Sequence, residues 1–504
     1  MTRFKRLAII VTLVAIALRV VVAFGVAVDS SGDGPIYQQI ARNVVQHGVY
    51  SAATQAPYEP TFIRMPGYPL VVAAVFATFG NGNVTALHAV QVVADMCTCW
   101  LVLLLALRWA PRSWDATRRD GAALAAFALY AVCPFTMAYI GTALAETWAV
   151  MLCTLSVWCA TWAMGADDAG MRRWALAGFV AGISCLFRPE LGLLLAVLGL
   201  MILTQRRASW PVTFGRGAVC AGAFAVALLP WTVRNGMVFR RFQPLPEVHA
   251  SMPNEFVPIG YLHWVRSWIT QPEQVEDFLW PLDDRAMNAS KLPALAFDAP
   301  TDVAHVRALF DTYNRAVRAD TSAEDSPTAR LPFALGNANA SAMSPTLDAE
   351  FGVLARARGT AHPLRQYLLL PATRAWNLWF DSHSIYYPFS AYTAPWTWPS
   401  EDEQGGWLLR VFYTGVWLYT LLAVWGMRQL WRDGAGRRWV LLATLLFVPR
   451  LAFLALSEVV EPRYMVELFP IVAVLGGLAL ASLVRRVPGA ISAGADLTPV
   501  GGGY

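Results

Sequence analysis

The amino-acid sequence predicts an all-α integral membrane protein, and three observations lead to this fold class. Of the 504 residues, 56% are hydrophobic and only 14% are charged, with a mean hydropathy of +0.43, whereas a soluble domain carries about 25% charged residues. Apolar runs of about 20 residues, the length of a membrane-crossing helix, recur along the chain. The basic residues, at a net charge of +5, form small clusters between these runs, which orients membrane spans and argues against binding to nucleic acid.

The apolar runs define the predicted crossings in order. Single transmembrane helices are expected at 7–28, 84–109, 120–140, 143–164, 216–238, 407–430, 437–457 and 463–484. The first run resembles a signal peptide, but its length and the lack of a small-residue cleavage site favour a retained span. Segment 174–205 begins and ends at basic clusters, so we expect a hairpin of two short helices that proline breaks between Phe187 and Glu190.

Basic clusters orient these helices, because short cytoplasmic loops collect lysine and arginine. The clusters that we place inside begin at Arg3, Arg108, Arg172, Arg206, Arg428 and Arg485. Two basic clusters on the same side of the membrane must be separated by an even number of crossings. Run 67–80 is therefore expected not to cross and to form a juxtamembrane helix. By the same argument, the aromatic segment 362–380 is expected to lie along the outer interface. The prediction is a polytopic bundle of about 10–12 transmembrane helices with both chain ends in the cytoplasm.

This topology predicts the domain organisation. An N-terminal transmembrane region, 1–238, contains a first outer loop at 29–83 with juxtamembrane helices. A large extracytoplasmic region follows at 239–406, then C-terminal transmembrane helices at 407–486 and a flexible tail at 487–504. All seven cysteines lie in apolar segments, where they act as small hydrophobic residues and say nothing about redox compartment.

An acidic residue in the first outer loop is the main catalytic candidate. Asp33 stands at the amino end of a predicted helix, 35–47, on which Tyr37 and Ala41 share one face. A carboxylate there is suited to act as a general base on a substrate hydroxyl. A helix N-cap is an equally supported interpretation, because aspartate is a favoured capping residue. Asp29 is a weaker alternative candidate for the base.

Arginines gather at the same predicted depth. Arg64 precedes the rigid turn Pro66–Pro69, and a guanidinium binds phosphate through two hydrogen bonds. The default alternative is contact with lipid headgroups. Further arginines map to outer helix ends, namely Arg188, Arg234 and Arg463. Each can instead be paired with a carboxylate such as Glu190, Glu458 or Glu461, but their repetition at one depth favours a functional role.

Four ionisable residues lie inside apolar runs: Arg19, Asp95, Glu146 and Arg450. Internal ion pairs that fix helix packing are at least as well supported as contact with substrate, so we assign none of them to catalysis. The sequence contains no P-loop, HExxH motif or zinc-type spacing of cysteine and histidine, so no metal ligands are assigned. The acidic turn 401–403 is compatible with a divalent cation, although a solvated turn is favoured.

Several stretches, taken in order, resemble the GT-C superfamily of membrane glycosyltransferases. They are the D-x3-Y-x3-A spacing from Asp33, "FIRMPGYPLVVAAVFATFG", "GTALAETWAVMLCTL", "AGISCLFRPELGLLL", "LLPWTVRNGMVFRRFQPLPE" and "EPRYMVELFPIVAVLGGLAL". Within the superfamily, the chain is most similar to bacterial members of the group that includes protein O-mannosyltransferases and the lipid A aminoarabinose transferase. It departs from the mannosyltransferases at Gly34, where they carry a second acid, and at "MPGYP", where they have a His-Pro-Pro turn.

The resemblance implies a hexosyl- or pentosyltransferase of the bacterial inner (plasma) membrane whose active site faces the periplasm or the cell exterior. Its donor would be a sugar on a polyprenyl phosphate, and its acceptor a glycolipid, a polysaccharide or a protein among the membrane lipids. It implies that Asp33 is the catalytic base and that Arg64 contacts the donor phosphate, with Arg188 and Arg463 near the lipid headgroup. Tyr37, Tyr68, Tyr464 and Glu190 are predicted to line the substrate pocket. No cofactor is firmly implied.

The residues themselves suggest the same mechanism. Outer arginines would stabilise the leaving phosphate while a carboxylate on the other side of the sugar takes the acceptor proton, giving a single displacement with inversion. Three alternatives remain: a transporter or flippase for lipid-linked sugars, an oligosaccharide ligase or polymerase, and a non-catalytic scaffold. Transporters more often carry internal repeats, and this chain shows one interrupted hairpin and no repeat.

Overall fold

The computed structural model describes residues 2–26, 32–165, 170–205, 209–249, 251–253, 255–322, 341–388 and 403–483. Regular structure in this part of the chain is helical throughout, which confirms the predicted fold class. The candidate Asp29, the first two residues of the acidic turn 401–403 and the predicted tail 487–504 lie outside the described residues.

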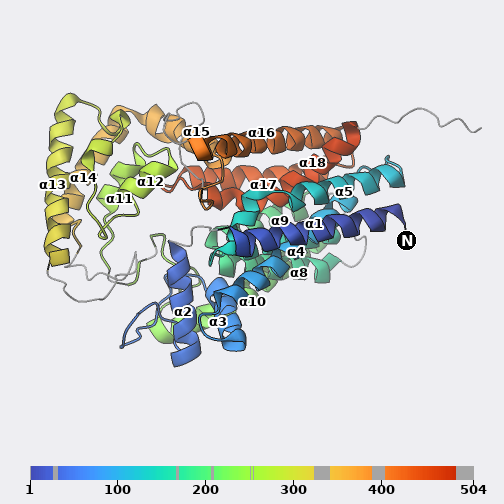
Figure 1. The fold of residues 1–504 in the computed structure, drawn as a ribbon, viewed down its shortest axis with the longest axis horizontal. Coiled ribbons are helices and arrows are strands. Elements are labelled where there is room, and N and C mark those ends of the chain that lie inside the picture. The colour runs from blue at the N-terminus through green and yellow to red at the C-terminus, as the bar shows by residue number, and fades with distance from the viewer. Residues whose placement is uncertain are drawn as a thin grey trace, which may run out of the picture.

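Within the described residues, helix fills most of every predicted span, and most of these helices run along one common direction (Figure 1). The bundle consists of α1 (Arg3–Gly25), α4 (Val84–Trp109), α5 (Ala116–Ala131), α6 (Pro134–Met137), η1 (Ala138–Gly141), α7 (Glu146–Ala163), α8 (Gly170–Phe187), η2 (Pro189–Gly192), α9 (Leu193–Leu203), α10 (Trp210–Phe239), α16 (Glu403–Arg432), α17 (Arg437–Ala455), η6 (Pro462–Leu468) and α18 (Phe469–Leu483). Proline ends α8 where the sequence predicts the hairpin to turn.

Six helices in the described residues are long and apolar enough to cross a membrane, with η6 and α18 counted as one. A seventh results if α5 and the α6–η1 segment, bent by 47°, form one span. The other predicted crossings, α7, α8 and α9, are helical but are shorter or less apolar than these six helices. We attribute this to the glutamate that begins α7, the paired arginines near the start of α8, and the 11-residue length of α9.

Close helix contacts in the bundle depend on small residues. A Cβ atom at Gly178 of α8 would collide with the backbone of Cys220 in α10, and one at Gly426 of α16 would collide with the backbone of Leu475 in α18. Because helices in a bilayer gain little from the hydrophobic effect, such close backbone packing is a main source of their association.

An internal ion pair joins three of these helices. Arg19 Nε of α1 lies 2.6 Å from Asp95 Oδ2 of α4, and both side chains are buried. Tyr130 Oη of α5 donates to Asp95 Oδ1 at 2.7 Å, and Arg19 Nη1 donates to the Ala131 carbonyl at 2.8 Å. The packing interpretation is therefore confirmed for Arg19 and Asp95.

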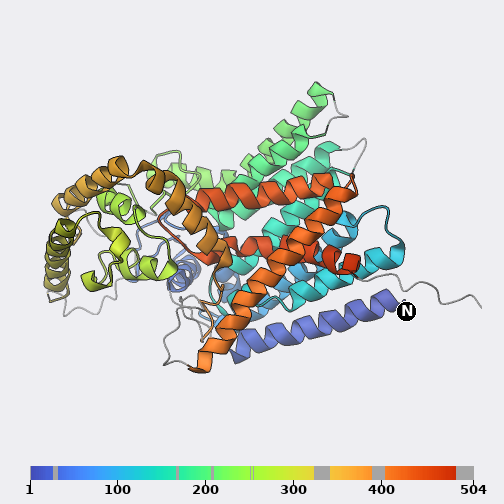
Figure 2. The ribbon, with the colours of Figure 1, turned by 90° about the horizontal axis from the view of Figure 1, so that it is seen from above.

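The two predicted outer regions lie at the same end of the bundle, away from the N-terminus (Figure 1). The first contains α2 (Asp33–His47), which lies across the bundle axis, and α3 (Gly67–Phe79). The second comprises α11 (Ile259–Arg266), α12 (Pro272–Phe278), η3 (Ala289–Lys291), η4 (Ala294–Ala296), α13 (Pro300–Ser322), α14 (Pro345–Ala361), the π-helical turn η5 (Arg365–Leu369) and α15 (Leu370–Phe380). Seen from above, α13 and α14 project beyond the bundle (Figure 2).

The predicted interfacial segment 362–380 is helical and has an exposed apolar side. Leu364, Tyr367, Leu368 and Trp376 are all exposed on η5 and α15 or just before them. Aromatic and apolar side chains in this pattern are typical of a helix resting on a membrane surface.

Candidate active site

Asp33 meets two of the predicted arginines where the outer regions join the bundle. Arg64 Nη2 lies 2.7 Å from Asp33 Oδ1, and Arg463 Nη2 lies 3.3 Å from Asp33 Oδ2. The three residues come from α2, from the loop before α3 and from η6, so the site brings together the N-terminal and C-terminal parts of the chain. The N-cap interpretation of Asp33 is wrong: Gly32 is the N-cap of α2, without a side-chain capping bond, and the carboxylate faces the arginines.

Local hydrogen bonds hold the loop that carries Arg64. The Asn43 amide donates to the carbonyls of Ser51 and Ala53, each at 2.8 Å, which folds the chain back along α2. Tyr50 Oη donates to the Arg64 carbonyl at 3.1 Å. Arg234, another predicted outer arginine, donates from Nη1 to the Thr61 carbonyl at 2.8 Å, so it anchors this loop from α10.

The ionisation of Asp33 follows from these contacts. Burial by itself raises the pKa of the carboxyl, but the Arg64 and Arg463 guanidiniums outweigh it and lower the pKa to about 2. Asp33 is thus a carboxylate at neutral pH. While both arginines hold it, however, it is a weak base.

A second charged cluster lies against the first. Arg188 Nη1 is 3.0 Å from Glu146 Oε1 and 3.4 Å from Glu467 Oε1, while Arg188 Nε is 2.6 Å from Glu190 Oε1. Arg450 Nη2 binds Glu467 Oε2 at 2.9 Å. Glu146 and Arg450 therefore belong to the site network, although their positions inside apolar runs favoured an internal ion pair at least as much as a contact with substrate. Arg188 is surrounded by carboxylates, which leaves Arg64 and Arg463 as the better candidates for a phosphate.

Tyrosines order the arginines of both clusters. The ring of Tyr464 contacts two guanidiniums, with its centroid 4.6 Å from Arg188 Cζ and 5.2 Å from Arg463 Cζ. Arg463 Nη1 also donates to Tyr386 Oη at 2.9 Å. Tyr386 lies in an irregular segment after α15, where no sequence pattern marked it.

The two remaining predicted pocket tyrosines pack against each other. The rings of Tyr37 and Tyr68 meet edge to face, with centroids 5.2 Å apart. Tyr68 is fully buried, and its hydroxyl donates to Gln91 Oε1 at 2.9 Å. Gln91 in turn donates to the Thr142 carbonyl at 2.8 Å. Tyr68, held by this hydrogen bond, thus packs against the Tyr37 ring and fixes its position.

Glu461 is a further buried carboxyl beside the site. It directly precedes η6 and is 0% exposed, and no side chain of the described structure donates a hydrogen bond to either of its oxygens. The expected pairing of Glu461 with an arginine is therefore absent. Burial raises the pKa of Glu461 to about 7, against the lowering effect of Arg463.

Glu467 and Tyr386 were missed by the sequence analysis for different reasons. Glu467 is a charged residue inside the apolar run 463–484, a signal that marks functional or paired groups and could have identified it.

The residues that the structure describes contain no group of three or more His, Cys, Asp or Glu side chains placed to bind a metal ion.

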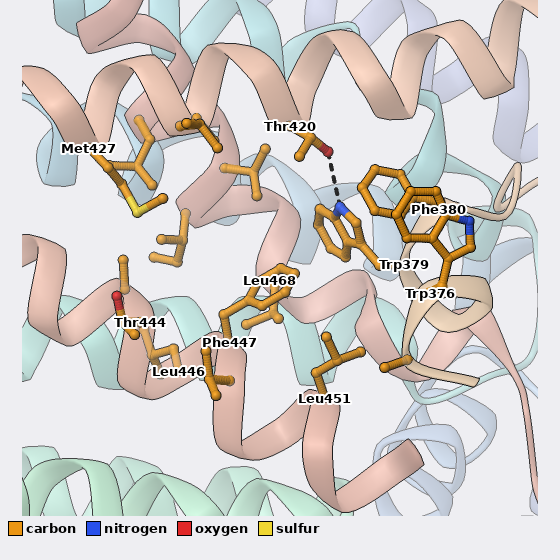
Figure 3. A pocket seen from close by; sticks show the side chains of 18 of the residues that line it. Trp376, Trp379, Phe380, Thr420, Met427, Thr444, Leu446, Phe447, Leu451 and Leu468 are labelled. Carbon is orange, nitrogen blue, oxygen red and sulfur yellow. Dashed lines mark hydrogen bonds between the residues drawn. The ribbon is translucent and has the colours of Figure 1, made fainter. Parts of the chain in front are cut away.

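The bundle contains an apolar cavity of about 510 Å³ (Figure 3). It is bounded by α15, α16, α17 and the η6–α18 segment, with Trp376, Phe380, Met427 and Phe447 among its lining residues. Trp379 Nε1 donates to Thr420 Oγ1 at 2.9 Å within its wall. Leu446 and Leu468 line both this cavity and a smaller one that touches Glu190 and Arg450, so only one layer of side chains separates it from charge.

Comparison with solved structures identifies the class of fold. A scan against protein-family models and a search of curated protein sequences each found no match. The oligosaccharyltransferase AglB of the archaeon Archaeoglobus fulgidus, solved with an inhibitory peptide and a dolichol-phosphate, superposes with a TM-score of 0.50 at 13% identity, covering 95% of this chain and 51% of AglB. The chain thus spans about half the length of AglB and has the GT-C fold, as the sequence resemblance predicted.

A second structure is also similar. ArnT of Cupriavidus metallidurans, bound to undecaprenyl phosphate, aligns at 14% identity over 94% of this chain and 78% of ArnT, with a TM-score of 0.37.

Proposed function

We propose that the protein is a membrane glycosyltransferase that moves a sugar from a polyprenyl-phosphate carrier to an acceptor outside the cytoplasm. The observation that carries this proposal is the contact of Asp33 with Arg64 and Arg463 at the end of a GT-C bundle. A carboxylate and two guanidiniums in contact supply the base and the phosphate-binding cations that such a transfer requires.

The reaction is a single displacement with inversion at the anomeric carbon. The acceptor oxygen loses its proton to the Asp33 carboxylate and forms a bond to this carbon. The bond from the carbon to the phosphate oxygen breaks, and its electron pair leaves with the polyprenyl phosphate. Arg64 and Arg463 stabilise the charge that develops on the leaving phosphate. The apolar cavity beside η6 offers a place for part of the isoprenoid chain.

The acceptor would be a glycolipid, a polysaccharide or a protein, reached from the periplasm or cell exterior of a bacterial inner membrane. The position of Asp33 favours a transferase over a transporter or flippase, because transporters bind their cargo near the bilayer midplane. In this chain Asp33 lies on α2 at one end of the bundle (Figure 1).

The test compares glycolipids and glycoproteins, by mass spectrometry, from cells that lack the protein and cells that carry wild type or Asp33→Asn. We expect the variant to insert and fold but to lose transfer by about 10²- to 10⁴-fold, the contribution of a general base. Glu59→Gln, an exposed acid in the same loop, is the matched control and should transfer normally. Full transfer by Asp33→Asn would reject Asp33 as the base.

A further inference from the structure

The charged side chains of the site balance one another. Four arginines, Arg64, Arg188, Arg450 and Arg463, face four carboxylates, Asp33, Glu146, Glu190 and Glu467, and each takes part in at least one ion pair. Among the described residues of this network, no guanidinium is left without a carboxylate. A phosphate that pairs with one of these arginines therefore competes with a carboxylate that is already bound to it.

Unused hydrogen-bond donors indicate which arginines a phosphate would take. Arg64 Nε and Arg463 Nε are buried and have no hydrogen-bond partner in the described structure. Arg463 Nε lies 3.9 Å from Glu146 Oε1, beyond hydrogen-bond distance. The Nε atoms of Arg188 and Arg450, by contrast, donate to Glu190 and to the Tyr464 carbonyl. Buried donors without partners are costly, so the free ones on Arg64 and Arg463 point to a ligand that supplies acceptor oxygens.

The exposed fraction of each side chain indicates which carboxylate a phosphate would displace from its arginines. The side chain of Asp33 is 22% exposed, against 15% for Glu190, 5% for Glu146 and 0% for Glu467. Asp33 alone among these carboxylates bridges the two arginines that have unused donors. A displaced Asp33 can exchange its arginines for water, whereas the more deeply buried glutamates would be left without solvation.

We propose that Asp33 occupies the donor-phosphate position as an internal counter-anion, and that the donor frees its own catalytic base by taking Arg64 and Arg463 from Asp33. This inference rests on the proposed function. In the free protein the two guanidiniums keep Asp33 a poor proton acceptor. Once they bind phosphate, the carboxylate is released toward the acceptor and its proton affinity rises. The base is then competent only when the donor is in place.

A phosphodiester that cannot transfer a sugar tests this exchange apart from catalysis. The probe is a short-chain polyprenyl methyl phosphate, which carries one negative charge throughout the pH range used. Binding to the full-length protein in detergent is measured by calorimetry at pH 7. We expect Asp33→Asn to bind the probe about tenfold or more tightly than wild type, because a competing charge-assisted contact is gone.

Removing a negative charge could strengthen binding by simple electrostatics, so a second carboxylate serves as the control. Glu59→Gln removes an equal charge from an exposed side chain of the same outer loop without vacating the position that bridges Arg64 and Arg463. We expect little change in its affinity. Equal tightening in both variants, or no tightening in Asp33→Asn, overturns the proposal.

Proton uptake gives a measurement that does not depend on the control folding. The charged and titratable groups that interact electrostatically with Asp33 are Arg64, Arg188, Arg463, Tyr37, Tyr386 and Tyr464. Release from the arginines raises the pKa of Asp33 from about 2, so wild type should take up protons when it binds the probe at pH 4.5 to 6. Calorimetry in buffers of different ionisation enthalpy measures this uptake, and Asp33→Asn should lose it.

Uptake that is equal in both proteins, or absent from wild type, overturns the exchange. These results remain separate from those on the proposed function. If Asp33→Asn transfers sugar normally, Asp33 is not the base, whatever the affinity of the variant for the probe. If Asp33→Asn is inactive but binds the probe with wild-type affinity, only the exchange is rejected.

Discussion

Glu461 should make the folded protein less stable as pH rises, and Glu461→Gln should remove this dependence. The carboxyl is 0% exposed and accepts no hydrogen bond from any side chain among the described residues. Burial therefore raises its pKa from an ordinary value of 4.5 to about 7. In the unfolded chain the same group is in water and ionises at its ordinary value.

The magnitude and sign follow from these two pKa values. Below pH 4.5 both states hold the proton, and the group adds no pH dependence. Between pH 4.5 and 7 the folded protein binds more protons than the unfolded chain, so the free energy of unfolding falls as pH rises. Each pKa unit corresponds to about 1.4 kcal/mol, and the loss from this one group is about 3 kcal/mol by pH 7.

The assay is unfolding of the detergent-solubilised protein between pH 5 and 8. We expect the Glu461→Gln variant to lose less stability over this range than wild type does. Glu247→Gln is the control, because Glu247 is 40% exposed beside Arg241 and its replacement should leave the wild-type slope unchanged. A variant at Glu461 that keeps the full wild-type slope would refute the assignment of this titration to Glu461.

Two further predictions concern the bundle. Arg19→Leu leaves the Asp95 carboxylate buried without its cation and should cost about 3–5 kcal/mol in unfolding experiments, while the additional change Asp95→Leu should recover much of this loss. Gly426→Val places a side chain against the Leu475 backbone and should sharply lower the yield of folded protein in a detergent-solubility assay. Gly121→Ala, in open space on α5, should leave the yield unchanged.

The helical framework was predictable because the bilayer restricts what the chain can do. A segment that crosses lipid must satisfy its backbone internally, so apolar length alone locates helices such as α4 and α17. Proline located the break between α8 and η2 for an equally local reason. A short helix that does not cross was predicted at 67–80 from the parity of basic clusters, and the helix α3 spans Gly67–Phe79.

The pairing within the site was beyond such local reasoning. Asp33 and Arg463 are separated by 430 positions in the chain, and no periodicity links them. The sequence identified Asp33 at a helix start but could not distinguish a cap from a residue turned toward a distant guanidinium. It likewise identified the charge of Arg188 but not the carboxylates that surround it. These contacts depend on how the helices pack.

The number of charges near the membrane is therefore a poor guide to which arginines bind a ligand. An unpaired charge at the edge of the hydrocarbon is costly, so nearly every arginine there acquires a carboxylate, whether its role is structural or functional. What differs is the strength of that pairing. Arg19 is fully buried against an equally buried aspartate, and its side chain also binds backbone carbonyls. Arg64 retains a free donor and shares a partly exposed aspartate with Arg463. A phosphate can compete for the second kind of arginine and not for the first, which is why the site is expected to lie at Arg64.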